Sequence, residues 1–149
     1  MELRIRSMGL DDIATLVAME RQIFPDPWPQ EAFLEGLRDN DHLFLVAEEE
    51  TGIVGYAAYY MEMGEARLTN IAVAKPYRRK SVAKKILNFI LEVINKAGCK
   101  YIFLDVRPSN AAAITFYRKF GFYDLYRRPD YYRNPVEDAL VMVKNLTQD

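Results

Sequence analysis

The stretch YRRKSVAKKILNFILEVI, residues 77–94, combines a cluster of positive charge with a helical pattern of apolar residues. Six basic residues and no acidic residue lie between Lys75 and Lys85. The apolar pattern predicts a helix over 82–96, which Gly98 ends. Its predicted core-facing side chains are Ile86, Phe89, Ile90, Val93 and Ala97. A helix start attracts anions, so the stretch suits a pyrophosphate, but a solvated charged face is the commoner reason for such a run.

The segments around this helix predict one α/β domain over residues 1–149. Strands over 67–74 and 101–106, which the helix joins, should run parallel. Strands over 42–48, 53–61 and 67–74 should form an antiparallel meander. The other expected elements are a strand around 3–5, helices over 30–38 and 109–120, and final strands over 122–127 and 139–143. A further helix, capped by Asp11 or Asp12, should carry the apolar positions Ile13, Leu16, Val17 and Ile23. The predicted fold class is therefore a mixed, mostly antiparallel sheet of about six to seven strands flanked by helices.

The composition argues against several classes of protein. With 20 basic and 21 acidic residues the net charge is −1, which does not suit a protein that coats nucleic acid. Cys99 is the only cysteine and His42 the only histidine, so an internal disulfide is ruled out and a zinc site is not expected. The N-terminal segment has no apolar signal region, and no apolar run approaches the length of a membrane span. We expect a cytoplasmic protein with no metal, membrane or nucleic-acid partner.

Five segments that span almost the whole chain resemble a known family. They are FPDPW (24–28), EARLTNIAV (65–73), YRRKSVAKKIL (77–87), SNAAAITFYRKFGF (109–122) and DYYR (130–133). Together they are similar to the GNAT superfamily of acyl-CoA-dependent N-acetyltransferases. They resemble more closely its RimI-type members, which acetylate the N-terminal alanine of a ribosomal protein, and related N-terminal acetyltransferases. The resemblance implies the GNAT fold, with a splayed parallel strand pair at a cofactor slot, and acetyl-CoA as co-substrate.

The resemblance places the cofactor on a strand, the basic loop and the following helices. In the family loop pattern Q/R-x-x-G-x-G/A, the fixed positions are Arg78, Ser81 and Ala83, so a serine replaces the first glycine. The serine is either tolerated, with its hydroxyl as an additional donor, or weakens cofactor binding. Asn110 has a second interpretation as a helix-start residue only. The implied cofactor-binding residues are Ile71, Ala72, Val73, Arg78, Arg79, Lys80, Ser81, Val82, Ala83, Lys84, Asn110 and Tyr117.

Acyl transfer from a thioester to an amine needs a base for the amine, stabilisation of the carbonyl oxygen and a proton for the departing thiolate. By the resemblance Tyr117 is the general acid, and its alternative interpretation is a half-buried core aromatic. Asp105 stands where RimI-type enzymes carry a glutamate base. Because aspartate is one methylene shorter, we expect it to act through a bridging water. The alternative for Asp105 is an ion pair with Arg107 or Arg78, and Glu65 is the substitute base.

FPDPW and DYYR match the two loops that frame the peptide groove of N-terminal acetyltransferases. The expected substrate-binding residues are therefore Phe24, Pro25, Tyr131 and Tyr132, with only one of the two tyrosines facing inward. The expected acceptor is a protein N-terminus, foremost that of a ribosomal protein. An α-amine has a pKa of about 7.7–8.0 and lysine one of about 10.4. The α-amine therefore depends less on a strong base, and no histidine is expected near the motifs.

Three other functions fit parts of the sequence. A small-molecule N-acetyltransferase, acting on a polyamine, an amino acid or an antibiotic amine, would share the cofactor site. A non-catalytic acyl-CoA-binding module would account for the serine in the phosphate loop. An RNA-binding protein fits least, because no RNA-recognition motif accompanies the basic run. Acetyl-CoA turnover with a panel of peptides separates the first two from the expected activity.

Overall fold

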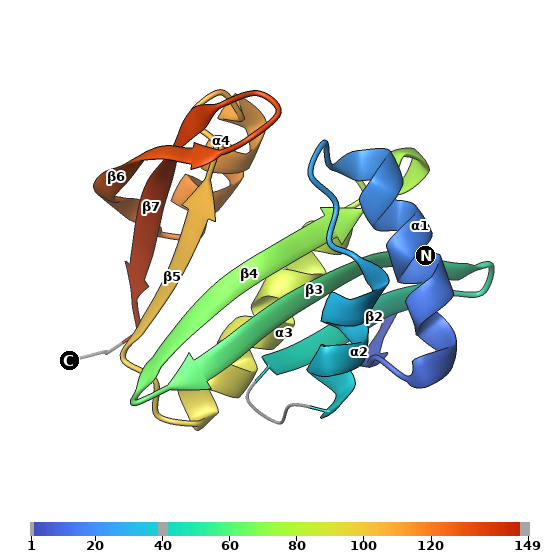
Figure 1. The fold of residues 1–149 in the computed structure, drawn as a ribbon. Coiled ribbons are helices and arrows are strands. Elements are labelled where there is room, and N and C mark those ends of the chain that lie inside the picture. Colours follow the sequence, from blue (N-terminus) through green and yellow to red (C-terminus); the bar gives the residue numbers. More distant parts are fainter. Residues whose placement is uncertain (1, 39–41, 147–149) are drawn as a thin grey trace.

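The computed structural model describes residues 2–38 and 42–146, which form one seven-stranded sheet with helices on both faces (Figure 1). The strands are β1 (Arg4–Ser7), β2 (His42–Glu49), β3 (Gly52–Glu62), β4 (Glu65–Val73), β5 (Tyr101–Val106), β6 (Tyr123–Tyr132) and β7 (Glu137–Asn145). The helices are α1 (Ile13–Ile23), α2 (Gln30–Arg38), α3 (Val82–Lys96) and α4 (Ala111–Lys119), with short 3-10 turns η1 (Leu10–Asp12) and η2 (Lys75–Tyr77). The strand order is β1-β2-β3-β4-β5-β7-β6, and only β4 and β5 run parallel within these residues. The predicted fold class is confirmed.

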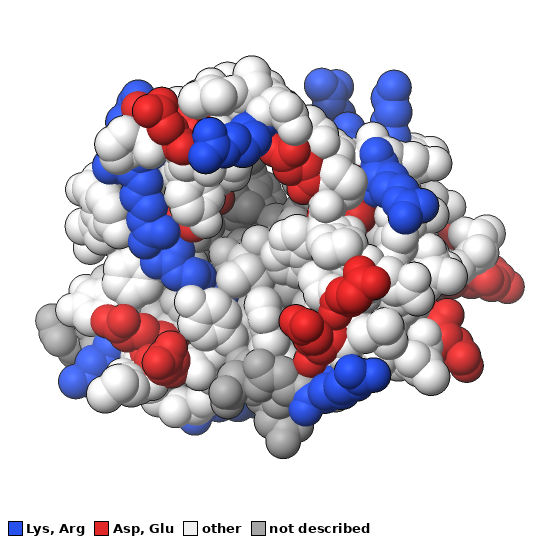
Figure 2. Space-filling model, in the orientation of Figure 1, with Lys and Arg blue, Asp and Glu red and all other residues white. Residues whose placement is uncertain are grey.

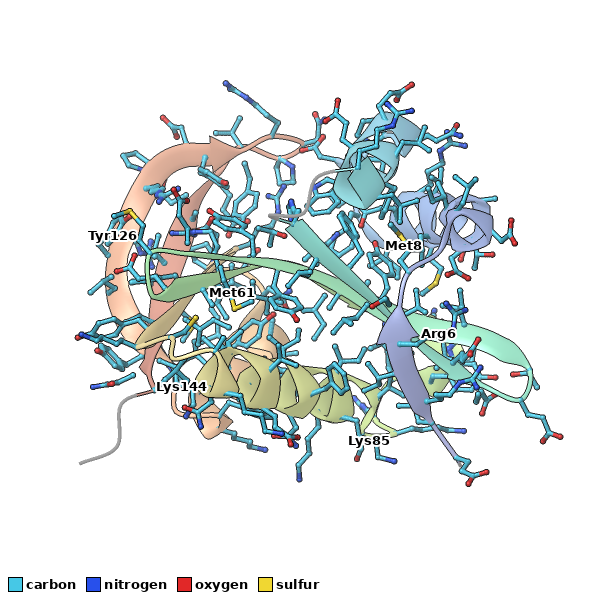
Figure 3. All side chains as sticks on the ribbon, turned by 90° about the horizontal axis from the view of Figure 1, so that it is seen from below. Arg6, Met8, Met61, Lys85, Tyr126 and Lys144 are labelled. Atoms are coloured by element: carbon cyan, nitrogen blue, oxygen red, sulfur yellow. The ribbon has the colours of Figure 1, made fainter. Side chains whose placement is uncertain are left out.

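The two faces of the sheet carry separate apolar clusters. One lies under α3 and α4 and includes Ile90, Ile102 and Ile114. The other lies under α1 and α2 and includes Leu16 and Phe33. Figure 3, which looks at the molecule from below, shows α3 on one side of the sheet and α1 and α2 on the other. No helix in the described part of the chain is long and apolar enough to cross a membrane.

Helix α3 has the predicted bounds, but its buried face is turned from the predicted one. Its buried side chains are Val82, Ile86, Leu87, Ile90 and Ile94. Phe89 is 36% exposed and Ala97 is exposed, so these two predictions were wrong. Apolar residues occupy more than one stripe of this helix, and spacing alone does not choose between the stripes. Packing against the sheet makes the choice, and it favours the stripe that holds Leu87 and Ile94.

Strand β6 is longer than predicted, and this changes the interpretation of DYYR. The strand runs to Tyr132 and does not end at Arg127, so the prediction that DYYR is a loop was wrong. Pairing with β7 continues through Arg128↔Ala139 to Tyr132↔Glu137, and an irregularity between these two pairs takes up the additional residues on β6. The end of β6 is therefore held by the sheet.

Candidate active site

Strands β4 and β5 pair over only part of their length. Their parallel register ends at Leu68↔Leu104. Beyond that point β4 stays paired with β3 as far as Val73, and β5 stays paired with β7 as far as Val106. The facing edges have no ladder partner there among the described residues. A slot therefore opens between the two strands, lined by backbone groups that need hydrogen-bond partners.

A β-bulge in β4 lies where this slot begins. The register with β3 shifts here, so that Thr69 is an additional residue on β4. The Thr69 hydroxyl donates to the carbonyl oxygen of Ala58 at 3.0 Å. Because a bulge bends its strand and increases its twist, β4 turns away from β5 at this point. The bulge thus produces the splayed pair that the family resemblance implied.

His42 reaches the bulge from β2. Its Nε2 lies 2.8 Å from the Thr69 hydroxyl oxygen, and its ring stands edge-on to Tyr60 and Trp28. Since the Thr69 hydroxyl donates to Ala58, His42 is the donor in the contact with Thr69. The only histidine therefore lies beside the slot, and the expectation that no histidine lies near the motifs was wrong. The antiparallel meander brings it there, which sequence spacing does not reveal.

The residues predicted to bind the pantetheine arm, Ile71, Ala72 and Val73, form the β4 side of the slot. Ile71 and Val73 pack against the cluster under α3, whereas Ala72 is buried in the cluster under α1 and α2. Their side chains thus belong to the core, and their backbone groups lie on the edge that β5 leaves free. An unpaired strand edge can bind an extended ligand through its N–H and C=O groups.

The loop before α3 contains two residues in the left-handed conformation. Arg79 and Ser81 both have a φ of 66°. Ser81 is the N-cap of α3, and its side chain makes no capping hydrogen bond. The alternation of left-handed Ser81 with helical Val82 directs successive N–H groups to one side, a geometry that binds anions. The loop therefore has the shape of a phosphate site even though a serine occupies the glycine position.

Four predicted phosphate-binding cations are exposed around this helix start: Arg78, Arg79, Lys80 and Lys84. Arg78 Nε donates to the Val73 carbonyl oxygen at 3.2 Å, and Lys80 Nζ lies 5.7 Å from the centroid of the Tyr77 ring. Within the described residues, none of the four forms an ion pair. Lys85 points away from the sheet (Figure 3). The positive charge at the start of α3 is thus available to a ligand.

Asn110 caps the helix that carries Tyr117. Its Oδ1 accepts a hydrogen bond from the Ala113 N–H at 3.1 Å, so the interpretation as a helix-start residue is confirmed. This cap fixes the start of α4 directly after β5. Contact with a pantetheine arm remains a prediction for this side chain.

Tyr117 is a buried aromatic residue on α4. It is 7% exposed, and its ring packs edge-on against Phe116 and Phe122. Burial raises the pKa of its phenol above the ordinary value of 10, and the neighbouring Tyr132 hydroxyl raises it further. The phenol therefore keeps its proton at neutral pH, as a proton donor must. Tyr117 meets the requirements of both interpretations, the core aromatic and the general acid.

Asp105 forms an ion pair, but with a different partner from those expected. Its carboxylate lies 3.2 Å from Arg67 Nη1. Arg107 instead pairs with Glu137, and Arg78 binds the backbone. The parallel register places Arg67 beside β5 on the same face as Asp105, which explains the pairing. The arginine holds the carboxylate at the point where the two strands separate.

The two candidate bases lie far apart. Glu65 is opposite Tyr101, at the first pair of the parallel register, and is exposed. Asp105 is four residues further along β5, which corresponds to about 13 Å at about 3.3 Å per residue. Asp105 therefore lies at the opening of the slot, and Glu65 lies at the opposite end of the paired region.

Two loops meet at the face that carries α1 and α2. Asn134, which follows DYYR, donates a hydrogen bond from Nδ2 to Asp26 Oδ1 of FPDPW at 2.7 Å. Figure 2 shows that this face is hollowed between the α1–α2 side and the part of the sheet formed by β5, β6 and β7. The predicted wall residues differ in exposure, because Phe24 packs on the core and Pro25 is exposed. The two motifs assigned to the acceptor thus lie together in space.

The two adjacent tyrosines point in different directions. Tyr132 is half-buried, with the Arg107 guanidinium 4.5 Å from its ring centroid. Burial and then the charge of Asp105 raise the pKa of Tyr132. Tyr131 is 47% exposed and stands edge-on to Tyr132 at 5.0 Å. One tyrosine thus faces the Asp105 side of the site, as expected, and the other faces outward.

Glu20 is a residue of the site that the sequence alone did not reveal. It is buried on α1 and accepts hydrogen bonds from the Trp28 N–H at 2.7 Å and from Asn70 Nδ2 at 2.6 Å. It also accepts one from the Tyr56 hydroxyl. Glu20 therefore ties the FPDPW segment to the strand that lines the slot. A carboxylate on the core-facing side of the 13–23 helix was the signal that could have revealed it.

An unpaired strand edge beside a basic helix start is the arrangement expected of an enzyme that binds an anionic, extended cofactor. Residues 13–122 match the Acetyltransferase (GNAT) family, and the chain belongs to this family. A putative [ribosomal protein bS18]-alanine N-acetyltransferase of Bacillus subtilis is 32% identical over 93% of this chain and 92% of that protein. An N-alpha-acetyltransferase of Sulfurisphaera tokodaii is 30% identical over 97% and 94% of the two chains.

The fold agrees with this family. The crystal structure of the ribosomal-protein-S18-alanine N-acetyltransferase from Escherichia coli superimposes with a TM-score of 0.90. The two proteins are 27% identical, and the match covers 99% of this chain and 96% of the other. The recognition of a GNAT acetyltransferase related to the RimI-type enzymes is thereby confirmed.

Proposed function

We propose that this protein transfers the acetyl group of acetyl-CoA to the N-terminal α-amine of a protein, with a ribosomal protein as the foremost candidate. The observation that carries the proposal is the slot between β4 and β5. The basic helix start lies at one end of it, and the FPDPW segment and the turn after DYYR are joined on one face. Relatives named for N-terminal acetylation match over nearly the whole chain, which supports the same choice of acceptor.

The residues around the slot fit acetyl-CoA as a co-substrate. The N–H groups at the start of α3 and the exposed Arg78, Arg79 and Lys80 suit the pyrophosphate and the 3′-phosphate. The free edge of 71–73 suits the pantetheine arm, which is extended and carries amide groups. In this arrangement the thioester lies at the mouth of the slot, between Asp105 and Tyr117.

The reaction then needs no covalent intermediate on the protein. The neutral α-amine attacks the thioester carbonyl carbon and forms a C–N bond. A water held by Asp105 takes the proton from the nitrogen and passes one to the Asp105 carboxylate. As the tetrahedral intermediate collapses, the C–S bond breaks and the thiolate takes the phenolic proton of Tyr117. Free backbone N–H groups on the β4 edge stabilise the carbonyl oxygen. Arg67 orients the Asp105 carboxylate through their ion pair.

The chemistry favours an α-amine over a lysine side chain. Their ordinary pKa values differ by about 2.5 units, equivalent to roughly 3–4 kcal/mol of deprotonation free energy near neutral pH. An aspartate acting through water is a weak base for that task. His42 is nearby, but its Nε2–H is directed at Thr69. An acceptor that already loses its proton near neutral pH is therefore the better match.

Two peptides of one sequence test the proposal. One has a free N-terminus and arginine in place of each lysine, and the other has a blocked N-terminus and keeps its lysines. We expect the protein to acetylate only the first peptide, as measured by mass spectrometry. The Asp105→Asn variant should lose this activity. Faster acetylation of the blocked peptide, or of a polyamine or free amino acid, would overturn the proposal. A mass increase on the N-terminus of a co-expressed small-subunit ribosomal protein would identify the acceptor.

A further inference from the structure

A cavity of about 380 Å³ lies beside the slot, at the closed end of the β3–β4 hairpin. The residues that matter here are Tyr60, Glu62, Glu65, Arg67, Phe103 and Tyr126. Figure 3 shows Tyr126 of β6 beside this end of the hairpin, and Figure 2 shows acidic side chains gathered over it. Arg67 both lines this cavity and pairs with Asp105, so the cavity continues the surface of the proposed active site.

Two carboxylates in the cavity repel each other. Glu62 and Glu65 are direct partners in the β3–β4 register and flank the tight turn. Like charges directly opposite each other destabilise an antiparallel pair. Neither of the two forms an ion pair within the described part of the chain. Folding does not require two glutamates here, because a lysine at either position would remove the repulsion and keep the hairpin.

The nearby arginines do not neutralise these carboxylates. Arg67 is paired with Asp105 at 3.2 Å, and its guanidinium lies 5.8 Å from the centroid of the Phe103 ring. Arg128 donates to the Tyr126 hydroxyl at 3.1 Å, and the charge of Asp105 also acts on it. The charge of Asp105 thus acts on both arginines, and neither forms an ion pair with Glu62 or Glu65. The end of the cavity at these two glutamates remains acidic.

The cavity therefore suits a cationic side chain. Carboxylates attract its charge, and the rings of Tyr60 and Tyr126 offer apolar surface and π-faces to its stem and head. Lysine and arginine are the side chains with both properties. We infer that this cavity binds a lysine or arginine of the acceptor peptide, downstream of the amine that is acetylated. This inference rests on the proposed function.

The strand register indicates which peptide position would reach the cavity. Asp105 and Glu65 are separated by four residues of strand, or about 13 Å. An extended peptide has nearly the same rise per residue. When the amine of the peptide lies at Asp105, the fourth or fifth residue of the peptide reaches the two glutamates. The cavity thus selects acceptors with a basic residue at that distance from the N-terminus.

The test uses a series of peptides with free N-termini and otherwise neutral side chains. Each peptide carries a single lysine, at one of the positions from the second to the eighth, and a lysine-free peptide is the reference. For the wild-type protein, we expect the KM to fall on the order of tenfold when the lysine stands at position four or five. The effect should shrink as salt is added, because exposed charges are screened. In the Glu62→Gln, Glu65→Gln double variant this preference should disappear. In Glu62→Gln alone it should weaken, with kcat for the lysine-free peptide unchanged.

Two controls test whether the lysine preference comes from these two carboxylates. Glu92→Gln, which changes an exposed carboxylate on α3, should leave the preference intact. Thermal unfolding of the double variant should show no loss of stability, since the change removes a repulsion.

A wild-type KM that does not depend on the lysine position overturns the inference and leaves the proposed function standing. A fall in kcat with every peptide after Glu65→Gln also overturns it, and assigns Glu65 the role of base. If the wild type acetylates no free N-terminus, the proposed function fails as well.

Discussion

At the scale of single residues, Ser81 has a backbone conformation that favours glycine. Its φ of 66° and ψ of 16° lie in the left-handed region, where a side chain costs roughly 1–2 kcal/mol and glycine costs almost nothing. The hydroxyl makes no capping hydrogen bond that would compensate. The backbone of the loop therefore keeps the shape that glycine favours, although the residue is serine.

We expect Ser81→Gly to keep or lower the KM for acetyl-CoA. The relief of the left-handed strain is partly offset by the greater freedom of glycine in the unfolded chain, so stability should change by between zero and about 1 kcal/mol in the favourable direction. Ser81→Ala is the matched control, because it removes the hydroxyl and keeps the strain. If both variants lose cofactor affinity, as measured by calorimetric titration, the hydroxyl is a ligand of the cofactor.

Tyr117→Phe tests the proton donor. The ring and its packing against Phe116 and Phe122 remain, so the urea midpoint of unfolding should change little. Turnover should fall roughly 10²- to 10⁴-fold if general acid catalysis is lost. Because burial raises the pKa of Tyr117 above 10, wild-type kcat should not decline between neutral pH and that value through loss of this proton. Near-normal turnover of the variant would leave Tyr117 only its place in the core.

At the scale of elements, α2 lies so close to β2 that one position excludes a side chain. A Cβ on Gly36 would lie 2.0 Å from Cε2 of Phe44. The Phe44 ring cannot move aside easily, because it is buried among Trp28, Phe33 and His42. This contact holds α2 against the sheet and so positions the FPDPW segment that precedes α2.

We expect Gly36→Ala to destabilise the protein by about 1–3 kcal/mol, as overpacking does. In an open helix the same change would stabilise by up to about 1 kcal/mol, so the sign is diagnostic. Gly9→Ala is the control, since the nearest atom to its Cβ would be 3.7 Å away. Urea unfolding measures both variants. A higher midpoint for Gly36→Ala would show that α2 has room to move.

At the scale of the whole molecule, Glu20 connects parts that are distant in sequence. Its carboxylate binds α1 to β3 through Tyr56, to β4 through Asn70, and to the acceptor loop through Trp28. Burial raises the pKa of the Tyr56 hydroxyl, and its contact with Glu20 raises it further. The position of the loop relative to the slot therefore depends on one buried carboxylate.

Glu20→Ala should destabilise the protein by about 2–4 kcal/mol, because it leaves several buried donors without an acceptor. It should also raise the KM for the acceptor peptide more than the KM for acetyl-CoA. Tyr56→Phe, which removes one donor and keeps the ring, should cost only about 1 kcal/mol. Denaturant unfolding and steady-state kinetics check these values. An equal rise in both KM values would mean that Glu20 supports the fold without positioning the acceptor loop.

Most of the fold was predictable because it depends on local patterns. The 82–96 helix, its end at Gly98 and the parallel pair that it joins follow from apolar spacing and from the handedness of strand connections. The basic helix start was recognisable for the same reason, since a helix start and its cations are neighbours in the chain. Membership of the acetyltransferase family was likewise readable from short segments in order along the chain.

Tertiary packing decided the features that join distant segments. It selected the stripe of α3 that is buried, extended β6 through DYYR, and paired Asp105 with Arg67 and not with Arg107 or Arg78. It also placed His42 at the bulge and Glu20 beneath the acceptor loop. The physical reason is that periodicity and capping act over a few residues, whereas strand register and side-chain pairing are set by the free energy of the whole packed sheet.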